Sequence, residues 1–339
     1  MKIFCFVDGR LNNFGDDLNR WMWGKILGRS LDTDDGTLVL AIGTVISREV
    51  IPPAKRYIVL SSGVGYGAPP VNFGGPEWEI LSVRGPLTAK VLGLPPEKAI
   101  VDGAALLRLL PECTPLPASE RDGIVFMPHY ESLHTGNWKE ACEMAGFGFL
   151  DPHTDSEQTV QRIRRARLVI ADAMHAAIVA DTLRVPWVPV ATSPQINSFK
   201  WLDWTLSLDL PYNPTPLPAS TLLESVRGSS FRFYGEKFYL EDRTPENALR
   251  HYRRMRKIKS WKYTPQCRLR LVQLTYSVPK KVVTSPVLRR FKKQQDQNRT
   301  HRAAEHLLRT AKLPSYLSGE NIFRSRFDRI THLLQKLYC

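Results

Sequence analysis

Short apolar runs alternate with amphipathic segments through the first part of the chain. The runs are almost continuous rather than alternating by two, which is typical of parallel strands covered by helices on both faces. We expect strands at 2–7, 37–42, 57–61, 79–83 and 99–102, and helices at 13–27 and 85–94. This order predicts a parallel, doubly wound α/β sheet.

The pattern stops at a Pro-rich segment, PECTPLPASER (111–121), and then restarts. Further strands are expected at 123–127, 146–150, 168–171 and 188–190, and helices at 138–145, 157–166 and 175–183. The chain therefore predicts two Rossmann-like domains that face a cleft, at 1–115 and 122–250.

Beyond about residue 211 the pattern weakens, with helices expected at 219–226, at 245–259 and in the tail 299–337. The charge is concentrated here. Residues 251–300 hold fifteen Lys or Arg and one acid, whereas the remaining 32 bases and 32 acids cancel. We expect a basic, mainly helical C-terminal extension at 251–339, whose charge needs its own explanation.

Cysteine usage and hydropathy favour a protein of the cytoplasm. The five cysteines are scattered and never in CxxC spacing, which fits thiols in a reducing compartment. Residues 1–10 are too briefly apolar for a signal peptide, and we find no stretch of about 20 apolar residues. There is no HExxH or CxxC motif, so we expect no metal and no redox cofactor.

The most informative histidine is His175, in LVIADAMHAAIVADTLRVPWVP (168–189). It opens a helix directly after an apolar strand, at the edge where open α/β sheets bind ligands. Helix N-terminal amides there favour a phosphate or carboxylate. Position alone leaves two interpretations equally open, a structural cap of the turn and an acid–base catalyst.

Arg84 is the second candidate, in SVRGPLTA (82–89). It leaves a strand just before a helix, and its planar guanidinium suits a carboxylate or phosphate. A structural ion pair with a neighbouring acid is equally compatible with this position.

Two glycine-containing loops follow strands in the first domain, DGRLNNFGDD (8–17) and SSGVGYG (61–67). Asn13, Asp16 and Asp17 are expected chiefly to cap and charge a helix, with sugar binding as the alternative. Gly63 in the second loop and His129, after the strand at 123–127, are further candidates for the cleft wall.

Six stretches together resemble the polysaccharide pyruvyltransferase family, especially its bacterial exopolysaccharide branch of succinoglycan and xanthan enzymes. They occur in family order over residues 1–210: NFGDDLN (13–19), LAIGTVIS (40–47), SSGVGYG, SVRGPLTA, VDGAALL (101–107) and ADAMHAAIVADTLRVPW (171–187). The resemblance implies a GT-B-like architecture that binds phosphoenolpyruvate between two domains. It also implies transfer of the pyruvyl group to a sugar of an exopolysaccharide precursor.

The resemblance includes one departure. Many relatives carry an arginine two residues before the cleft histidine, where this chain has Ala173. Another base must then hold the donor, with Arg84 as the leading candidate and Arg184 or Lys200 as alternatives.

Two other functions compete with pyruvyl transfer. A nucleotide-sugar glycosyltransferase could use the same architecture, because fold does not settle chemistry. A nucleic-acid-binding protein could use the basic segment, but no RRM, KH, zinc-finger or basic-zipper signature is present. In the implied pyruvyltransferase the acceptor is a lipid-linked oligosaccharide. The bases and aromatics of 251–270 (HYRRMRKIKSWKYTPQCRLR), with Lys280, Lys281 and LRRFKK (288–293) further on, would then attach the protein peripherally to the anionic inner face of the membrane. A solvated basic face packed on the body is the alternative.

Overall fold

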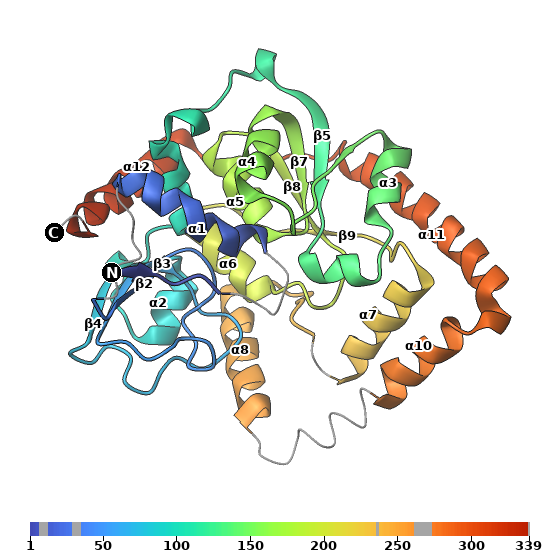
Figure 1. Cartoon of the computed structure of the whole chain (residues 1–339), viewed down its shortest axis with the longest axis horizontal. Helices are drawn as coiled ribbons and strands as arrows, with labels where there is room; N and C mark the ends of the chain where they lie inside the picture. The colour runs from blue at the N-terminus through green and yellow to red at the C-terminus, as the bar shows by residue number, and fades with distance from the viewer. Residues whose placement is uncertain (7–12, 29–34, 235–236, 261–272, 338–339) are drawn as a thin grey trace.

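The computed structural model describes residues 1–6, 13–28, 35–234, 237–260 and 273–337. They contain two parallel sheets with helices around both (Figure 1). The first sheet has the order β1–β2–β3–β4, with strands Lys2–Ile3, Thr37–Leu40, Arg56–Ser62 and Trp78–Val83. Its register pairs Leu38 with Tyr57 and Val39 with Ile58, so that β2 and β3 share one buried layer.

The second sheet has five strands in the order β6–β5–β7–β8–β9, and all of its pairs are parallel. The strands are Asp122–Met127 (β5), Gly148–Phe149 (β6), Ala166–Ala171 (β7), Trp187–Ala191 (β8) and Thr215–Pro216 (β9). The central strands β7 and β8 are buried almost throughout, which explains their unbroken apolar sequences. The mixed α/β class with parallel sheets is thus confirmed.

The helices between strands are α1 (Phe14–Leu27), α2 (Pro86–Leu92), α3 (Trp138–Ala145), α4 (Ser156–Arg165), α5 (Met174–Thr182) and α6 (Ser198–Ser207). Local signals set their ends. Gly28 and Gly93 adopt left-handed conformations after α1 and α2, and Pro86 occupies the first turn of α2.

One expected strand is absent from the described structure. Within 99–102, Ala99 makes an isolated bridge to Val83, and the chain then turns into a 3-10 helix, Gly103–Leu109 (η2). The reason is Asp102, whose side chain accepts a hydrogen bond from the Ala104 amide at 3.0 Å and caps that helix. The strand expected at 2–7 is shorter in the structure and ends at Ile3. Residue 7 of the expected strand lies outside the described residues.

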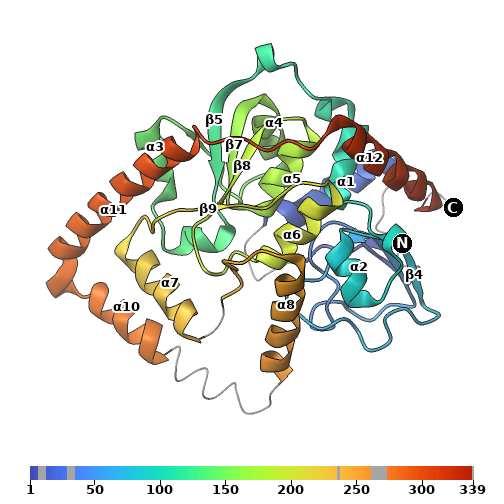
Figure 2. The ribbon, with the colours of Figure 1, turned by 180° about the vertical axis from the view of Figure 1, so that it is seen from behind.

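The C-terminal part is helical where it is described. Its helices are α7 (Leu222–Tyr234), α8 (Pro245–Ser260), α10 (Val278–Val283), α11 (Arg289–Thr310) and α12 (Glu320–Leu334). In Figures 1 and 2, α11 and α12 lie at opposite ends of the molecule, α11 beside α3 and α12 beside the first sheet. The C-terminal segments therefore pack against both sheets.

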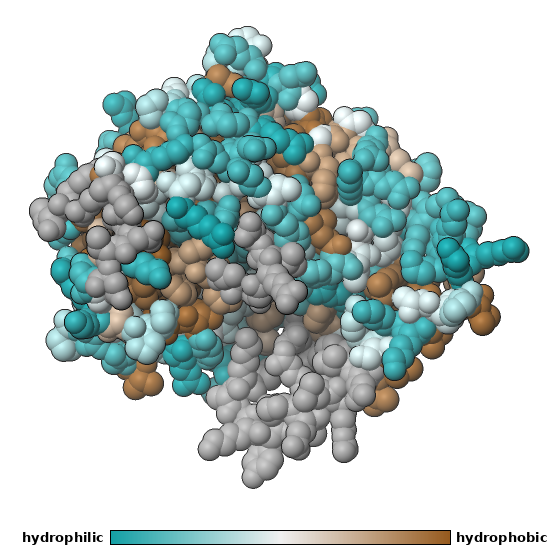
Figure 3. Space-filling view, viewed as in Figure 1, coloured by the Kyte–Doolittle hydropathy of each residue, from teal (hydrophilic) through white to brown (hydrophobic). Residues whose placement is uncertain are grey.

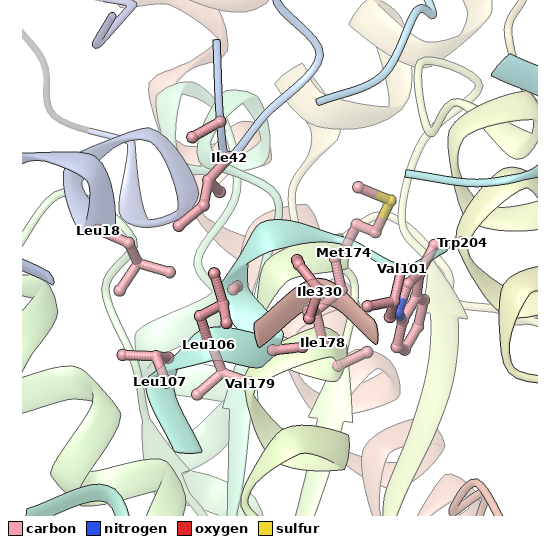
Figure 4. Close-up of a cluster of buried hydrophobic side chains, with 14 of the residues drawn as sticks. Leu18, Ile42, Val101, Leu106, Leu107, Met174, Ile178, Val179, Trp204 and Ile330 are labelled. Carbon is pink, nitrogen blue, oxygen red and sulfur yellow. The ribbon is translucent and has the colours of Figure 1, made fainter. Parts of the chain in front are cut away.

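One continuous apolar core joins the two sheets and the tail. Figure 4 shows Leu18 of α1, Leu106 of η2, Ile178 of α5, Trp204 of α6 and Ile330 of α12 in a single buried cluster. Burying such side chains stabilises the fold by about 1.5–3 kcal/mol each. Within the described residues, no helix is both long and apolar enough to cross a bilayer.

Candidate active site

A cavity of about 310 Å³ lies where the two sheets meet, at the carboxyl ends of their strands. The first sheet contributes Thr44, after β2, and Tyr66, after β3. The second contributes His129 after β5, His175 after β7 and Lys200 after β8. The volume falls at the lower end of the range for small-molecule sites.

Three helices begin at this cavity. The lining includes the first residues of α1 (Phe14, Gly15), of α5 (Met174, His175) and the N-cap of α6 (Asn197). Each N-terminus carries a partial positive charge, although the first amides of α6 already donate to Asn197 and to the Phe238 carbonyl. Their convergence makes the cavity suited to an anion with more than one charged group.

Lys200 adds a full positive charge. It is the only lysine or arginine among the cavity-lining residues of the described chain. Its Nζ donates to the hydroxyl of Tyr66 at 3.2 Å and lies 4.7 Å from the centre of that ring. Its alkyl chain passes Gly65, where a Cβ would lie 2.8 Å from Lys200 Cγ, so the glycine-rich loop leaves room for this lysine.

His175 lies between the cavity and Asp102. Its Nε2 is 3.9 Å from Asp102 Oδ2, and neither atom has a hydrogen-bond partner in the described structure. Burial, together with Lys200 and Arg84, lowers the pKa of His175 to about 3. Burial raises the pKa of Asp102 to about 6, against the attraction of Arg84. At neutral pH the imidazole is therefore uncharged, and the aspartate behind it is ionised.

His129 is a second neutral imidazole in the cavity wall. Burial lowers its pKa to about 3, and Lys200 and Arg227 act in the same direction. Its backbone amide donates to Asp172 at 2.8 Å, and Asp172 also accepts from the amide and hydroxyl of Thr192. Asp172 therefore fixes the ends of β5 and β8 beside the cavity.

The loop before α1 supplies two of the expected residues. Asn13 and Asp16 line the cavity, and Asn13 Nδ2 donates to Asp16 Oδ2 at 2.7 Å. Burial raises the pKa of Asp16 to about 6. Asp17 points elsewhere: it accepts from Ser156 at 2.8 Å and pairs with Arg20 at 3.2 Å, fastening α1 to α4.

The expectation that Arg84 holds the donor is wrong, because its side chain does not reach the cavity. Its side chain is completely buried and donates to Asp203 at 3.0 Å, to the Thr44 hydroxyl at 2.9 Å and to the Val64 carbonyl at 3.0 Å. A buried charge needs such a partner set, and this one joins the first sheet to α6. Arg84 therefore supports Thr44, which lines the cavity, rather than presenting its guanidinium there.

Gly63 and Arg184 also lie outside the cavity lining. A Cβ at Gly63 would lie 2.4 Å from Arg84 Cζ, so this glycine makes room for the buried guanidinium. Arg184 donates to Ser318 at 2.9 Å, pairs with Glu320 at 3.0 Å and stacks over Phe323. Its role in the structure is to hold α12.

Comparison with known proteins shows the family of this chain. The chain is 40% identical over 246 residues to succinoglycan biosynthesis protein ExoV of Rhizobium meliloti (strain 1021), a match that covers 72% of this chain and 77% of that protein. The chain belongs to the exopolysaccharide pyruvyltransferase family. Membership supports a transferase role in exopolysaccharide biosynthesis. No protein-family model and no solved structure matches the chain.

A prediction specific to this pyruvyltransferase-family chain concerns Gly15, at the second position of α1. A Cβ there would lie 1.8 Å from His175 Nδ1. Alanine elsewhere in a helix is more stable than glycine by about 1 kcal/mol. Here we expect Gly15→Ala to displace the imidazole and lower kcat by about 100-fold, the cost of misplacing a reacting group by about 1 Å.

The matched control for this change is Gly228→Ala, in α7. A Cβ at Gly228 meets only Pro194, at an ordinary 3.7 Å, so its activity should equal that of the unmodified protein. Steady-state kinetics gives kcat for both variants and so tests the prediction. Full activity of Gly15→Ala would show that the imidazole is not held against α1.

Two residues that line the cavity, Tyr66 and Asn197, were not expected from the sequence. Asn197 caps α6 by accepting from the Phe199 and Lys200 amides, and its Nδ2 donates to the Gly65 carbonyl at 3.0 Å. Tyr66 lies within the motif SSGVGYG, but its partner Lys200 is 134 positions away.

The described residues contain no cluster of His, Cys, Asp or Glu able to hold a metal ion.

Proposed function

We propose that this protein transfers the pyruvyl group of phosphoenolpyruvate to a sugar of an exopolysaccharide precursor, forming a cyclic ketal and releasing phosphate. The observation that carries the proposal is the convergence of three helix N-termini and Lys200 on one small cavity beside a neutral histidine. Phosphoenolpyruvate carries a phosphate and a carboxylate on a three-carbon enol, which fits the small size of this cavity and the helix N-termini and lysine in its wall, where Asp16 and Asp172 also lie. The arrangement of the two sheets around it is, in this proposal, GT-B-like.

In this mechanism His175 moves the protons. As one sugar hydroxyl adds to C2 of the enol, its proton passes through His175 to the methylene C3, which becomes methyl. The phosphate then leaves C2, with the electron pair of the broken C–O bond, and an oxocarbenium ion forms. The second hydroxyl closes the ketal, and its proton passes through His175 to the departing phosphate.

Asp102 acts through His175 in this proposal. Its carboxylate faces Nε2, so it stabilises the imidazolium that forms when the ring accepts a proton. Because it lies behind the ring and does not line the cavity, it is a positioning residue and does not touch the substrate.

Lys200 takes the place of the arginine that many relatives carry at the position of Ala173. Ala173 and Lys200 both line the cavity; Ala173 follows β7, and Lys200 follows the neighbouring strand β8. The ammonium group would hold the phosphate or carboxylate of the donor and stabilise the charge that develops as phosphate leaves.

The acceptor would approach from the side of Tyr66. This ring also lines a second cavity, of about 450 Å³, together with Arg48, Arg253 and Arg256. Tyr252 of α8 holds this region together by donating to the Gly67 carbonyl at 2.7 Å. An acceptor saccharide with a phosphate-bearing end would place its sugar near His175 and its anionic end among these bases.

Replacing Lys200 with glutamine tests the donor site. We expect the dissociation constant for phosphoenolpyruvate to rise about 10- to 100-fold, because a hydrogen bond to a charged group contributes about 1.5–3 kcal/mol. Isothermal titration calorimetry measures the constant directly. Lys139→Gln, an exposed lysine of α3, is the matched control and should leave it unchanged. Equal affinities for the two variants would move the donor site away from Lys200.

A further inference from the structure

The corner formed by residues 274–293 exposes apolar side chains to solvent. It comprises α10, the short 3-10 helix Pro286–Leu288 (η7) and the first turn of α11. The exposed fractions are 67% at Leu274, 50% at Val278, 53% at Val282, 91% at Val287 and 55% at Phe291. Figure 3 shows hydrophobic surface along this edge, over α10 and the start of α11. Soluble proteins rarely gather such side chains without a partner for them.

The same residues carry a uniform positive charge. Segment 274–293 contains Lys280, Lys281, Arg289, Arg290, Lys292 and Lys293 and no acid. Five of these six bases are exposed, and the sixth, Lys292, pairs with Asp296. Apolar and basic side chains are therefore interleaved on one surface.

The corner contributes little to the core. Neither α10 nor η7 has a buried residue, and the buried positions of α11 begin at Asp296, after the basic turn. Both ribbon views show α10 and the adjoining end of α11 projecting away from the two sheets (Figures 1 and 2). The apolar side chains here therefore do not serve the packing of the described chain.

We infer that residues 274–293 bind the surface of an anionic lipid bilayer. The apolar side chains enter the boundary between headgroups and acyl chains, and the bases meet the anionic headgroups. A nucleic acid would match the bases and leave the valines and Phe291 unexplained. A second copy of this chain would bring two identical positive patches together. The inference does not depend on the reaction, because membrane binding is measured without turnover.

The surface expected on sequence grounds included these bases but was centred on 251–270. Residues 261–270 of that segment lie outside the described residues, and within its described part Tyr252 and Met255 are buried. Both ribbon views place α8 and α10 along the same edge of the molecule (Figures 1 and 2). The second cavity, lined by Arg253 and Arg256 of α8, therefore belongs to the edge that would face the membrane.

Vesicle sedimentation with the full chain tests the inference. The vesicles are phosphatidylcholine alone or with phosphatidylglycerol, at low and high salt. One triple variant removes apolar side chains (Val282→Ser, Val287→Ser, Phe291→Ser) and another removes charge (Lys281→Gln, Arg289→Gln, Arg290→Gln). We expect binding that requires phosphatidylglycerol and weakens with salt. Each triple variant should lower the partition coefficient by at least about tenfold.

The controls change similar side chains elsewhere on the surface. Val71→Ser removes a valine that is 95% exposed, and Lys139→Gln with Arg167→Gln removes two exposed charges. Both should bind vesicles as the unmodified protein does, and all variants should share its thermal unfolding midpoint. A protein that stays in the supernatant with every vesicle would overturn the inference. So would vesicle binding unchanged by the apolar triple variant, DNA binding that only the charge variant weakens, or a dimer that the apolar variant dissociates.

Discussion

Replacing His175 with glutamine is expected to lower kcat by about 100-fold or more while the protein stays folded. Positioned proton transfer contributes about 10²–10⁴-fold, and glutamine cannot accept a proton. The amide fills a similar volume in a wall where the histidine side chain is only 12% exposed, so packing should survive. Phosphate release from phosphoenolpyruvate in the presence of acceptor measures kcat, and donor titration should show nearly unchanged affinity.

The control for His175→Gln is His153→Gln. His153 also has an aspartate beside it, with Nδ1 3.1 Å from Asp151 Oδ1, but it does not line the active-site cavity. Its replacement should leave kcat unchanged. Near-normal turnover of a folded His175→Gln variant would make His175 a structural residue of the strand–helix turn.

Replacing Asp102 with asparagine is expected to lower kcat by roughly 100-fold, because the imidazolium loses its only facing carboxylate in the described structure. The KM for phosphoenolpyruvate should change little, since Asp102 does not line the cavity. Asparagine retains the oxygen that accepts the Ala104 amide, so the cap of η2 and the fold should persist.

The pH dependence of this effect separates positioning from a purely structural role. The pKa of Asp102 is raised to about 6, so in the unmodified protein its carboxylate is ionised above pH 6 and progressively protonated below it. The ratio of unmodified to variant activity should therefore be largest at neutral pH and shrink as the pH falls through about 6. Asp172 also has a pKa raised to about 6, but it is present in both proteins. The pKa of Asp16 is raised to about 6 by burial and partly by the charge of Asp102, so it should be lower in the variant. A ratio independent of pH would mean that the charge of Asp102 has no part in turnover.

Local sequence signals accounted well for the individual elements. The helix expected at 138–145 occurs with those bounds, and α1 begins directly after Asn13, whose side chain makes no capping hydrogen bond. His175 at the turn between β7 and α5 follows from a strand, a turn and a helix read in order along the chain. These features depend on neighbours within a few residues, which a single sequence displays.

Contacts between distant segments were not predictable in the same way. Arg84 could be expected either to pair with an acid or to bind an anion, and the decision came from Asp203, 119 positions later. The cap that Asp102 forms depends only on its neighbours in the sequence, but its place behind His175 depends on how the two sheets approach each other. Lys200 appeared among the alternatives because it is basic, and only the fold shows that it reaches the cavity.

The C-terminal part shows the same distinction. Its helices were expected from their amphipathic pattern, but nothing local shows that α12 would place Ile330 in the shared core. The pattern also did not show that Arg184 would bind Ser318 and Glu320 of the tail. Because of these contacts, Arg184 does not reach the cavity.

The most direct test of the proposed function is incubation of the purified protein with phosphoenolpyruvate and lipid-linked oligosaccharides from cells that produce an exopolysaccharide. The measurements are phosphate release and the mass of the oligosaccharide. The account predicts phosphate release that depends on the oligosaccharide, together with a gain of one pyruvyl ketal per acceptor. Consumption of a sugar nucleotide, with phosphoenolpyruvate left intact, would contradict it and identify a glycosyltransferase.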